Sequence, residues 1–224
     1  MINLKNYIIE SILDVEDNID NIDESIKDQI KQFLNNNFKN ASKCKISEKP
    51  NKYGKFEVSS NEKVEVKNEY ITSLTNGLFI WTNIQGNFIC SDCESLISLE
   101  GAPEKVGGDF YCSDCNSLTT LEGAPKEVGG YFNCSRCDSL TSLEGAPKKV
   151  GLDFDCFSCN SLKSLEGAPK EVGGGFSCFK CKSLTSLEGA PKEVGRDFYC
   201  RSCKGKFTEE DVKNVSNVKG IIFL

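Results

Sequence analysis

A 22-residue unit recurs without insertion between residues 88 and 203, and its clearest copy is FYCSDCNSLTTLEGAPKEVGGY, residues 110–131. A fixed period of this length is typical of a solenoid, because one unit cannot bury its apolar side alone and must pack against its neighbours. The period therefore predicts an array of stacked turns. The cysteine pairs that mark it are Cys90/Cys93, Cys112/Cys115, Cys134/Cys137, Cys156/Cys159, Cys178/Cys181 and Cys200/Cys203.

Each unit contains an FxC segment that predicts one short strand, because two residues that are two apart point to the same side of a strand. The chain then returns beneath this strand through a leucine pair such as Leu118 and Leu121, turns at EGAPK, and enters the next unit at Val128. Seven or eight strands spaced by about 4.8 Å predict a parallel sheet roughly 35 Å long. The predicted inward columns are Phe88, Phe110, Phe132, Phe154, Phe176, Phe198 and Ile222, and Cys90, Cys112, Cys134, Cys156, Cys178, Cys200 and Leu224.

Both ends of the array contain degenerate copies, as expected for the terminal repeats of a solenoid. The segment 64–74, VEVKNEYITSL, matches FYCSDCNSLTTL with one residue fewer and places Val66 where the first Cys stands. The segment 218–224 repeats the pattern of 194–200 and places Leu224 at the same position. Between them, Thr208 and Asp211 form a capping-box pattern that predicts a short helix.

The first 60 residues differ from the array. Residues 1–40 predict two helical segments, followed by a loop with Pro50 and Gly54 and a strand over residues 55–58. Acidic residues gather here, and they are either a solvated face of a cap or a docking surface for a basic partner. The predicted division is a helical N-terminal cap or small domain at 1–60 and a repeat solenoid at 61–224, with regular repeats at 88–203 and a C-terminal cap at 204–224.

The unit resembles known repeat families. LTTLEGAPKEV is similar to the LxxLPxLPxxL frame of short bacterial leucine-rich repeats, and FxCxxC is similar to the strand of that class, although two one-residue insertions separate the patterns. The LEGAP/CxxC unit is also similar to repeat proteins common in bacteriophage and bacterial genomes. The resemblance implies a leucine-rich-repeat-like parallel β-solenoid. Together with the helical N-terminal cap and the short C-terminal helix plus strand cap predicted from the residues, the expected fold class is α+β. It implies a scaffold for binding and identifies no partner.

The cysteine pairs allow a zinc reading, because successive CxxC pairs are a common four-thiolate pattern. Val66 and Leu224 replace the first Cys in the degenerate copies, which suits a small buried apolar side chain better than a metal ligand. The second Cys is placed to donate weakly to backbone carbonyls. We therefore expect reduced structural thiols, with no metal and no cofactor, and a zinc-binding cysteine array is the alternative.

Composition narrows the function. The chain has no histidine, the commonest general base, which favours a protein that is not an enzyme. Its net charge is −6 and no block is strongly basic, so we expect no direct contact with nucleic acid. No apolar run reaches membrane-spanning length, and the first residues lack a secretory signal pattern, so we expect no membrane and a cytoplasmic location, the host cytoplasm if the gene is phage-encoded.

Variation between the copies marks candidate binding residues. The position before each Phe and the position after it alternate out of the strand and vary, and aromatic and acidic side chains there are plausible anchors for a protein partner. The alternative is that they are only solvated. A second column, within and after CxxC, changes from acidic to basic along the array. The candidates are Tyr111, Tyr131, Tyr199, Asp109, Asp153, Asp155 and Asp197 on the strands, and Asp17, Asp20 and Glu24 in the acidic helices.

These patterns predict a protein-binding repeat scaffold without enzymatic activity. A basic nucleic-acid-binding protein is one kind of partner that the acidic residues would suit. One alternative is a phage-encoded inhibitor of a host defence nuclease, similar to an anti-CRISPR protein, that binds and occludes a basic channel. The zinc-binding array is the other alternative.

Overall fold

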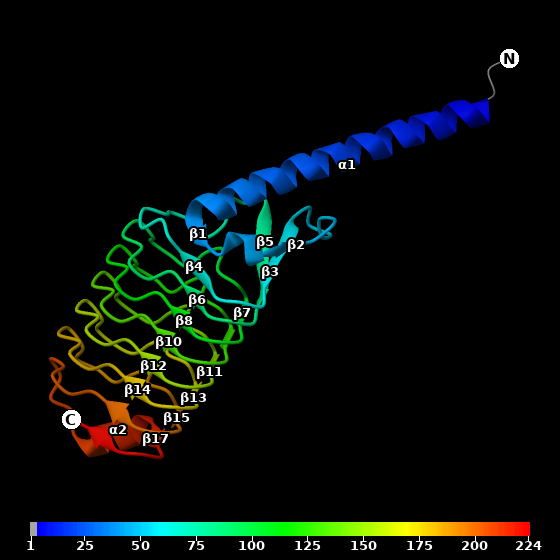
Figure 1. Cartoon of the computed structure of the whole chain (residues 1–224). Coiled ribbons are helices and arrows are strands. Elements are labelled where there is room, and N and C mark those ends of the chain that lie inside the picture. Colours follow the sequence, from blue (N-terminus) through cyan, green and yellow to red (C-terminus); the bar gives the residue numbers. More distant parts are fainter. Residues whose placement is uncertain (1–3) are drawn as a thin grey trace.

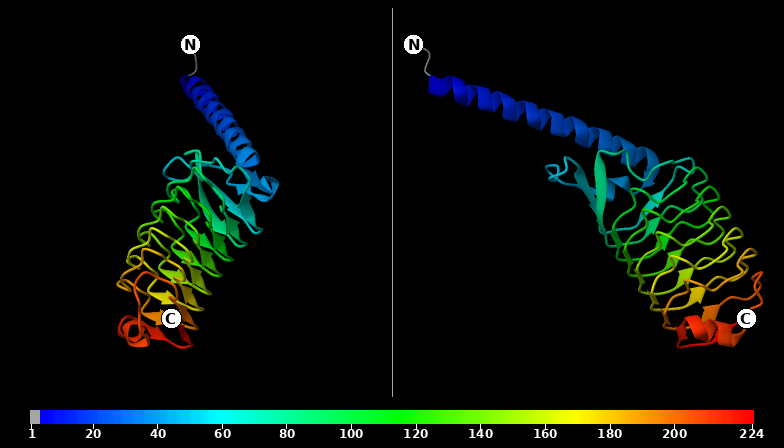
Figure 2. Two further views of the ribbon diagram at one scale, coloured as in Figure 1. Left: turned by 90° about the vertical axis from the view of Figure 1, so that its left-hand side faces the viewer. Right: turned by 180° about the vertical axis from the view of Figure 1, so that it is seen from behind.

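The computed structural model describes residues 4–224, and it describes the side chains of Ile19 and of residues 21–224. The chain forms a parallel β-solenoid with a long helix at its N-terminal end (Figures 1 and 2). The expected period is confirmed, because within the regular repeats each FxC strand pairs in parallel with the strand 22 residues later, as in Phe110 with Phe132. The predicted α+β solenoid with a helix at one end and a short helix plus strand at the other is also confirmed.

In the described residues the turns build two nine-stranded sheets. The phenylalanine sheet holds the FxC strands. In spatial order it contains β1 (Phe38–Lys39), β4 (Val64–Val66), β6 (Phe88–Ile89), β8 (Phe110–Tyr111), β10 (Phe132–Asn133), β12 (Phe154–Asp155), β14 (Phe176–Ser177), β16 (Phe198–Tyr199) and β18 (Ile222–Phe223).

The valine sheet is formed where each turn enters the next unit, and the repeat pattern alone did not predict it. In spatial order it contains β17 (Asn217–Val218), β15 (Glu193–Val194), β13 (Glu171–Val172), β11 (Lys149–Val150), β9 (Glu127–Val128), β7 (Lys105–Val106), β5 (Phe79–Ile84), β3 (Phe56–Ser60) and β2 (Lys45–Ile46).

The core lies between the two sheets and the leucine segment. The phenylalanine that opens each FxC strand, from Phe88 to Phe198, is fully buried, and these rings form a column with centroids 5.1 to 5.6 Å apart. The first cysteines of the pairs and the leucines are buried beside them. The predicted inward columns are therefore confirmed within the array. At its C-terminal end Ile222 is half-buried, and the prediction is wrong for Leu224, which is 43% exposed because no described turn covers it.

The cysteine pairs of the repeats form two columns of free thiols that are buried except at Cys203, and all thirteen cysteines of the chain are unbridged. The second Cys of a pair donates its thiol proton to the carbonyl of the first Cys one turn earlier, with Cys115 Sγ 3.1 Å from Cys90 O and Cys159 Sγ 3.1 Å from Cys134 O. Burial raises the pKa of the Cys112 thiol well above its ordinary value. Burial thus favours the protonated form in the column of first cysteines, and the thiols of both columns are reduced, as predicted.

The N-terminal cap contains one continuous helix, α1 (Leu4–Asn37), where two segments were predicted. No Gly or Pro interrupts residues 4–37, so nothing in the chain ends the first segment. Ile30 and Leu34 bury themselves over the first turns, and Phe33 packs against Phe79 with ring centroids 5.9 Å apart. β1 and β2 then pair antiparallel with β4 and β3 and cover the edge of each sheet.

A short 3₁₀ helix, η1 (Ala41–Lys43), joins β1 to β2. The division at residue 60 stays a prediction. At the other end, α2 (Glu209–Val215) begins with the predicted capping box, in which Asp211 N donates to Thr208 Oγ1 at 3.2 Å and Thr208 N donates to Asp211 Oδ2 at 2.8 Å. Val212 anchors this helix in the core. Within the described residues, no helix combines the length and the apolar character that crossing a membrane requires.

Candidate functional site

A row of Asn and Asp side chains, one before each Phe, binds the backbone of the following turn. Oδ1 of Asn87 accepts the N–H of Asp109 at 2.9 Å, and Oδ1 of Asp109 accepts the N–H of Tyr131 at 2.9 Å. The same contact joins Asp153 to Gly175 N and Asp197 to Ile221 N, each at 2.7 Å. We call Asn87, Asp109, Asp153 and Asp197 the Asx ladder. It satisfies a backbone donor at the entrance to the strand of the next turn.

The ladder requires a glycine in the next turn. A Cβ at Gly130 would lie 2.0 Å from Asp109 Oδ1, and one at Gly174 would lie 2.0 Å from Asp153 Oδ1. The corresponding distances at Gly108 and Gly220, from Asn87 and Asp197, are 2.2 and 2.3 Å. Atoms that are not bonded cannot approach this closely, so a ladder residue and the glycine 21 or 23 residues later form one steric unit.

Two turns break the ladder, and at both the pair changes together. Tyr131 stands where a ladder residue is expected, and its partner position holds Leu152 in place of glycine. Gly175 is the second break, and its partner position holds Arg196. Neither Tyr131 nor Gly175 offers a side-chain acceptor to the next turn. Because no carboxylate occupies the space, a larger partner side chain fits there.

We call these the Tyr131/Leu152 gap and the Gly175/Arg196 gap. Tyr131 is 39% exposed and Leu152 is 38% exposed, in neighbouring positions of consecutive turns, where Leu152 N donates to Gly130 O at 3.1 Å. Arg196 is exposed as well. The gaps thus place an aromatic, an aliphatic and a cationic side chain on a surface that is otherwise held by carboxylates and glycines.

The predicted tyrosines at the neighbouring turns contact the ladder. The hydroxyl of Tyr111 donates to Asp109 Oδ2 at 3.1 Å, and that of Tyr199 donates to Asp197 Oδ2 at 3.1 Å. Partial burial and the adjacent Asp109 raise the pKa of Tyr111. Tyr199 also stacks on Phe223 with ring centroids 4.6 Å apart. These tyrosines are oriented by the structure, whereas Tyr131 stands at a gap.

The predicted aspartates have structural contacts that the sequence analysis did not foresee. Asp109, Asp153 and Asp197 are ladder residues, and Asp155 Oδ1 accepts the N–H of Phe157 at 2.8 Å. Burial raises the pKa of the Asp155 carboxyl, a shift that this backbone hydrogen bond opposes. An internal signal could have revealed the ladder, because the Asx and glycine positions change together among the six consecutive pairs.

The acidic helix is a separate element that extends away from the array (Figures 1 and 2). Glu24 is exposed on α1 and forms an ion pair with Lys27 at 2.8 Å. Asp17 and Asp20 lie within the bounds of α1, and their side chains fall outside the described residues. The structure does not bring Glu24 together with the strand candidates.

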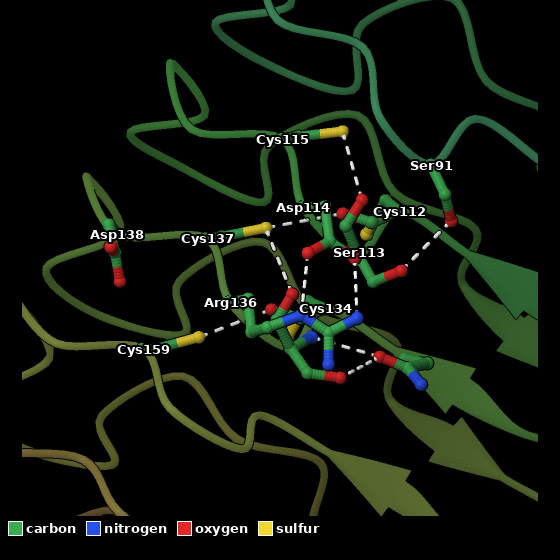
Figure 3. Close-up of polar contacts among 12 residues, drawn as sticks. Ser91, Cys112, Ser113, Asp114, Cys115, Cys134, Arg136, Cys137, Asp138 and Cys159 are labelled. Carbon is green, nitrogen blue, oxygen red and sulfur yellow. Dashed lines mark hydrogen bonds and ion pairs between the residues drawn. The ribbon is translucent and has the colours of Figure 1, made fainter.

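The CxxC turns form a second surface beside the phenylalanine sheet (Figure 3). Arg136 donates two hydrogen bonds to Asp114 of the preceding turn, from Nε to Oδ1 at 2.5 Å and from Nη2 to Oδ2 at 2.7 Å. This guanidinium lowers the pKa of Asp114. Farther along, Phe157 stacks on Phe179 at 5.5 Å, and Lys180 Nζ lies over both rings. The side chains of this surface were predicted to change from acidic to basic along the array, and the ion pair of Asp114 with Arg136 lies where an acidic turn is followed by a basic one.

In the part of the chain that the structure describes, no group of three or more Cys, Asp or Glu side chains is placed to hold a metal ion. The paired thiols face backbone carbonyls instead. Cys44 lines a cavity of about 430 Å³ between α1 and β2, and burial raises the pKa of its thiol to about 11.

No protein family, curated protein or solved structure matches this chain. The class is therefore defined by the fold and the surface alone: a parallel β-solenoid repeat protein with an invariant core and a side on which a few positions depart from the repeat.

Proposed function

We propose that the protein is a binding scaffold without catalytic activity of its own, which holds a protein partner on the phenylalanine sheet at the two gaps. The observation that supports this is the paired replacement of ladder and glycine by Tyr131 with Leu152 and by Gly175 with Arg196. If single positions drifted at random, some turns would keep the Asp opposite a bulky side chain, and others would keep the glycine opposite a position without a carboxylate.

Each gap gives up a stabilising contact. A hydrogen bond to a charged acceptor contributes about 1.5–3 kcal/mol, and a gap loses one such bond to the backbone. In exchange the surface gains Tyr131 and Arg196, and Tyr and Arg are the residue types that most often dominate binding energy at protein interfaces. Stability is exchanged for exposed anchors, which is typical of functional positions.

The side chains around the two gaps indicate the chemistry of a partner that would fit them. Tyr131 and Leu152 offer an apolar contact, while Asp153 and Asp155 beside them are half-buried acidic groups. A partner that fits presents an apolar side chain flanked by Lys or Arg. The gaps are two turns apart, about 10 Å at the strand spacing, which matches the roughly 10.5 Å between residues i and i+7 of a partner helix.

A host defence nuclease is one class of partner with such basic surfaces, and we propose its inhibition by occlusion as the second form of this function. The acidic groups beside the gaps and the net charge of −6 support it. Addition of the protein to a purified CRISPR nuclease then reduces DNA binding, and the variant described next loses the effect.

The test restores the ladder. The variant carrying Tyr131→Asp and Leu152→Gly recreates the Asp109/Gly130 arrangement, so we expect unchanged or higher thermal stability together with loss of the partner captured by the wild-type chain. Ile97→Ser, on the exposed leucine side and away from the sheet, is the matched control and retains capture. If the restored ladder captures the same partner with equal affinity, the gaps are not the binding site.

A further inference from the structure

Helix α1 is longer than its packing against the solenoid requires. Its C-terminal part contacts the core through Ile26, Ile30, Phe33 and Leu34, whereas its N-terminal part extends beyond the array (Figures 1 and 2). Ile19 is 50% exposed and Ile22 is 54% exposed on this extension. Large aliphatic side chains on a projecting helix leave an apolar stripe without a partner in the described chain.

The stripe has the spacing of a coiled coil. Apolar residues alternate at intervals of four and three residues along the helix, which places them at the a and d positions of consecutive heptads. The positions are Ile8 (d), Ile12 (a), Val15 (d), Ile19 (a), Ile22 (d) and Ile26 (a).

The ion pairs that the structure describes on α1 do not involve the a and d positions. The ion pairs of α1 in the described part of the chain, Glu24 with Lys27 at 2.8 Å and Asp28 with Lys31 at 2.9 Å, join residues at the b, c and f positions. These positions face away from a coiled-coil partner. These pairs stabilise the helix without occupying its a and d positions, of which Ile19 and Ile22 are exposed while Ile26 packs on the solenoid core.

We propose that α1 joins copies of this chain in a parallel coiled coil. Between residues 8 and 26 the e positions hold Ile9, Glu16 and Asp23, and the g positions hold Ser11, Asn18 and Ser25. In a parallel arrangement each g residue lies beside an e residue of the neighbouring copy, so neutral side chains meet acids. An antiparallel arrangement would set acidic e positions against each other. Ile at both a and d favours three or more strands.

This inference is independent of the proposed binding function. A parallel bundle gathers the solenoids at one end and presents several copies of the gap surface around the bundle axis at that end. Several weak sites carried by one assembly bind a repeated or multimeric partner more tightly than one site does.

The test is the mass of the full-length protein in solution. Sedimentation equilibrium is expected to give at least twice the chain mass of 24.7 kDa, and the combined Ile19→Asp and Ile22→Asp variant is expected to return to that mass with the solenoid's thermal transition unchanged. Glu24→Ala, at an f position, keeps the assembly. Ile22→Cys is expected to form an interchain disulfide on oxidation, because parallel chains in register bring equal d positions together.

A wild-type chain that stays monomeric across a concentration series overturns the inference. So does an assembly that persists in the double variant, and so does a monomer whose exposed stripe captures only a different protein.

Discussion

Replacing Asp153 by alanine is the sharpest test of the ladder, because Asp153 lies between the two gaps and its Oδ1 accepts the N–H of Gly175 at 2.7 Å. A hydrogen bond to a charged acceptor contributes about 1.5–3 kcal/mol, and the partial exposure of Asp153 places this one at about 2 kcal/mol. For a chain of this size, about 2 kcal/mol lowers the midpoint of thermal unfolding by roughly 4–8 °C.

Two measurements resolve the effect. Circular dichroism gives the unfolding midpoint, and amide hydrogen exchange reports the Gly175 N–H, whose exchange is expected to accelerate by roughly 30-fold for 2 kcal/mol. Asp153→Asn is the matched control, because the side-chain oxygen of Asn87 performs the same task at 2.9 Å. Tyr131→Ala, at a gap, removes no ladder bond. If Asp153→Ala costs no more stability than Tyr131→Ala, the ladder does not hold the turns together.

Further outcomes follow from neighbouring contacts. Gly130→Ala is expected to destabilise the protein by about 2 kcal/mol, and by less in an Asp109→Ala background where the opposing oxygen is gone, as a double-mutant cycle measures. The Cys44 thiol, with a pKa of about 11, is expected to react slowly with a thiol reagent at pH 8 and faster as the pH rises. Because its folded pKa exceeds its unfolded value, its contribution to stability is present below pH 9 and is lost as the pH rises through 11, which urea titrations at several pH values detect. Asp114 has the opposite pH dependence of stability, because Arg136 lowers the pKa of its carboxyl. Its contribution to stability is lost as the pH falls through the folded pKa, and Arg136→Ala is expected to remove that dependence.

The sequence predicted the core because the period is strict. Phe110 and Cys112 lie two apart in a strand, and 22-residue spacing without insertions leaves one register for stacking. Val66 showed that the first cysteine position is apolar, and the structure buries it. These predictions needed only alternation and repetition.

The rest depended on contacts between turns. Asp109 alternates out of the strand, so sequence alone makes it a solvated carboxylate, and only the stacked geometry brings its Oδ1 to Tyr131 N. The valine sheet escaped prediction because a two-residue strand such as β9 carries no alternation signal. The two predicted helices merged into α1 because an acidic stretch reduces the apolar signal without breaking the backbone.

The ring column explains how the solenoid tolerates two gaps. Phe132 and Phe154 stack across the first gap with ring centroids 5.1 Å apart, and Phe176 and Phe198 pack across the second with centroids 5.1 Å apart and their ring planes tilted by 39°. The three ladder-bonded interfaces at which two phenylalanines meet have ring distances of 5.4 to 5.6 Å. In a solenoid each turn contacts only its neighbours, so a missing ladder bond weakens one interface and the core contact there must hold it. The intact bond of Asp153 separates the two weakened interfaces. The exposed anchors thus stand on turns that remain stacked, and a rigid surface loses less entropy when a partner binds.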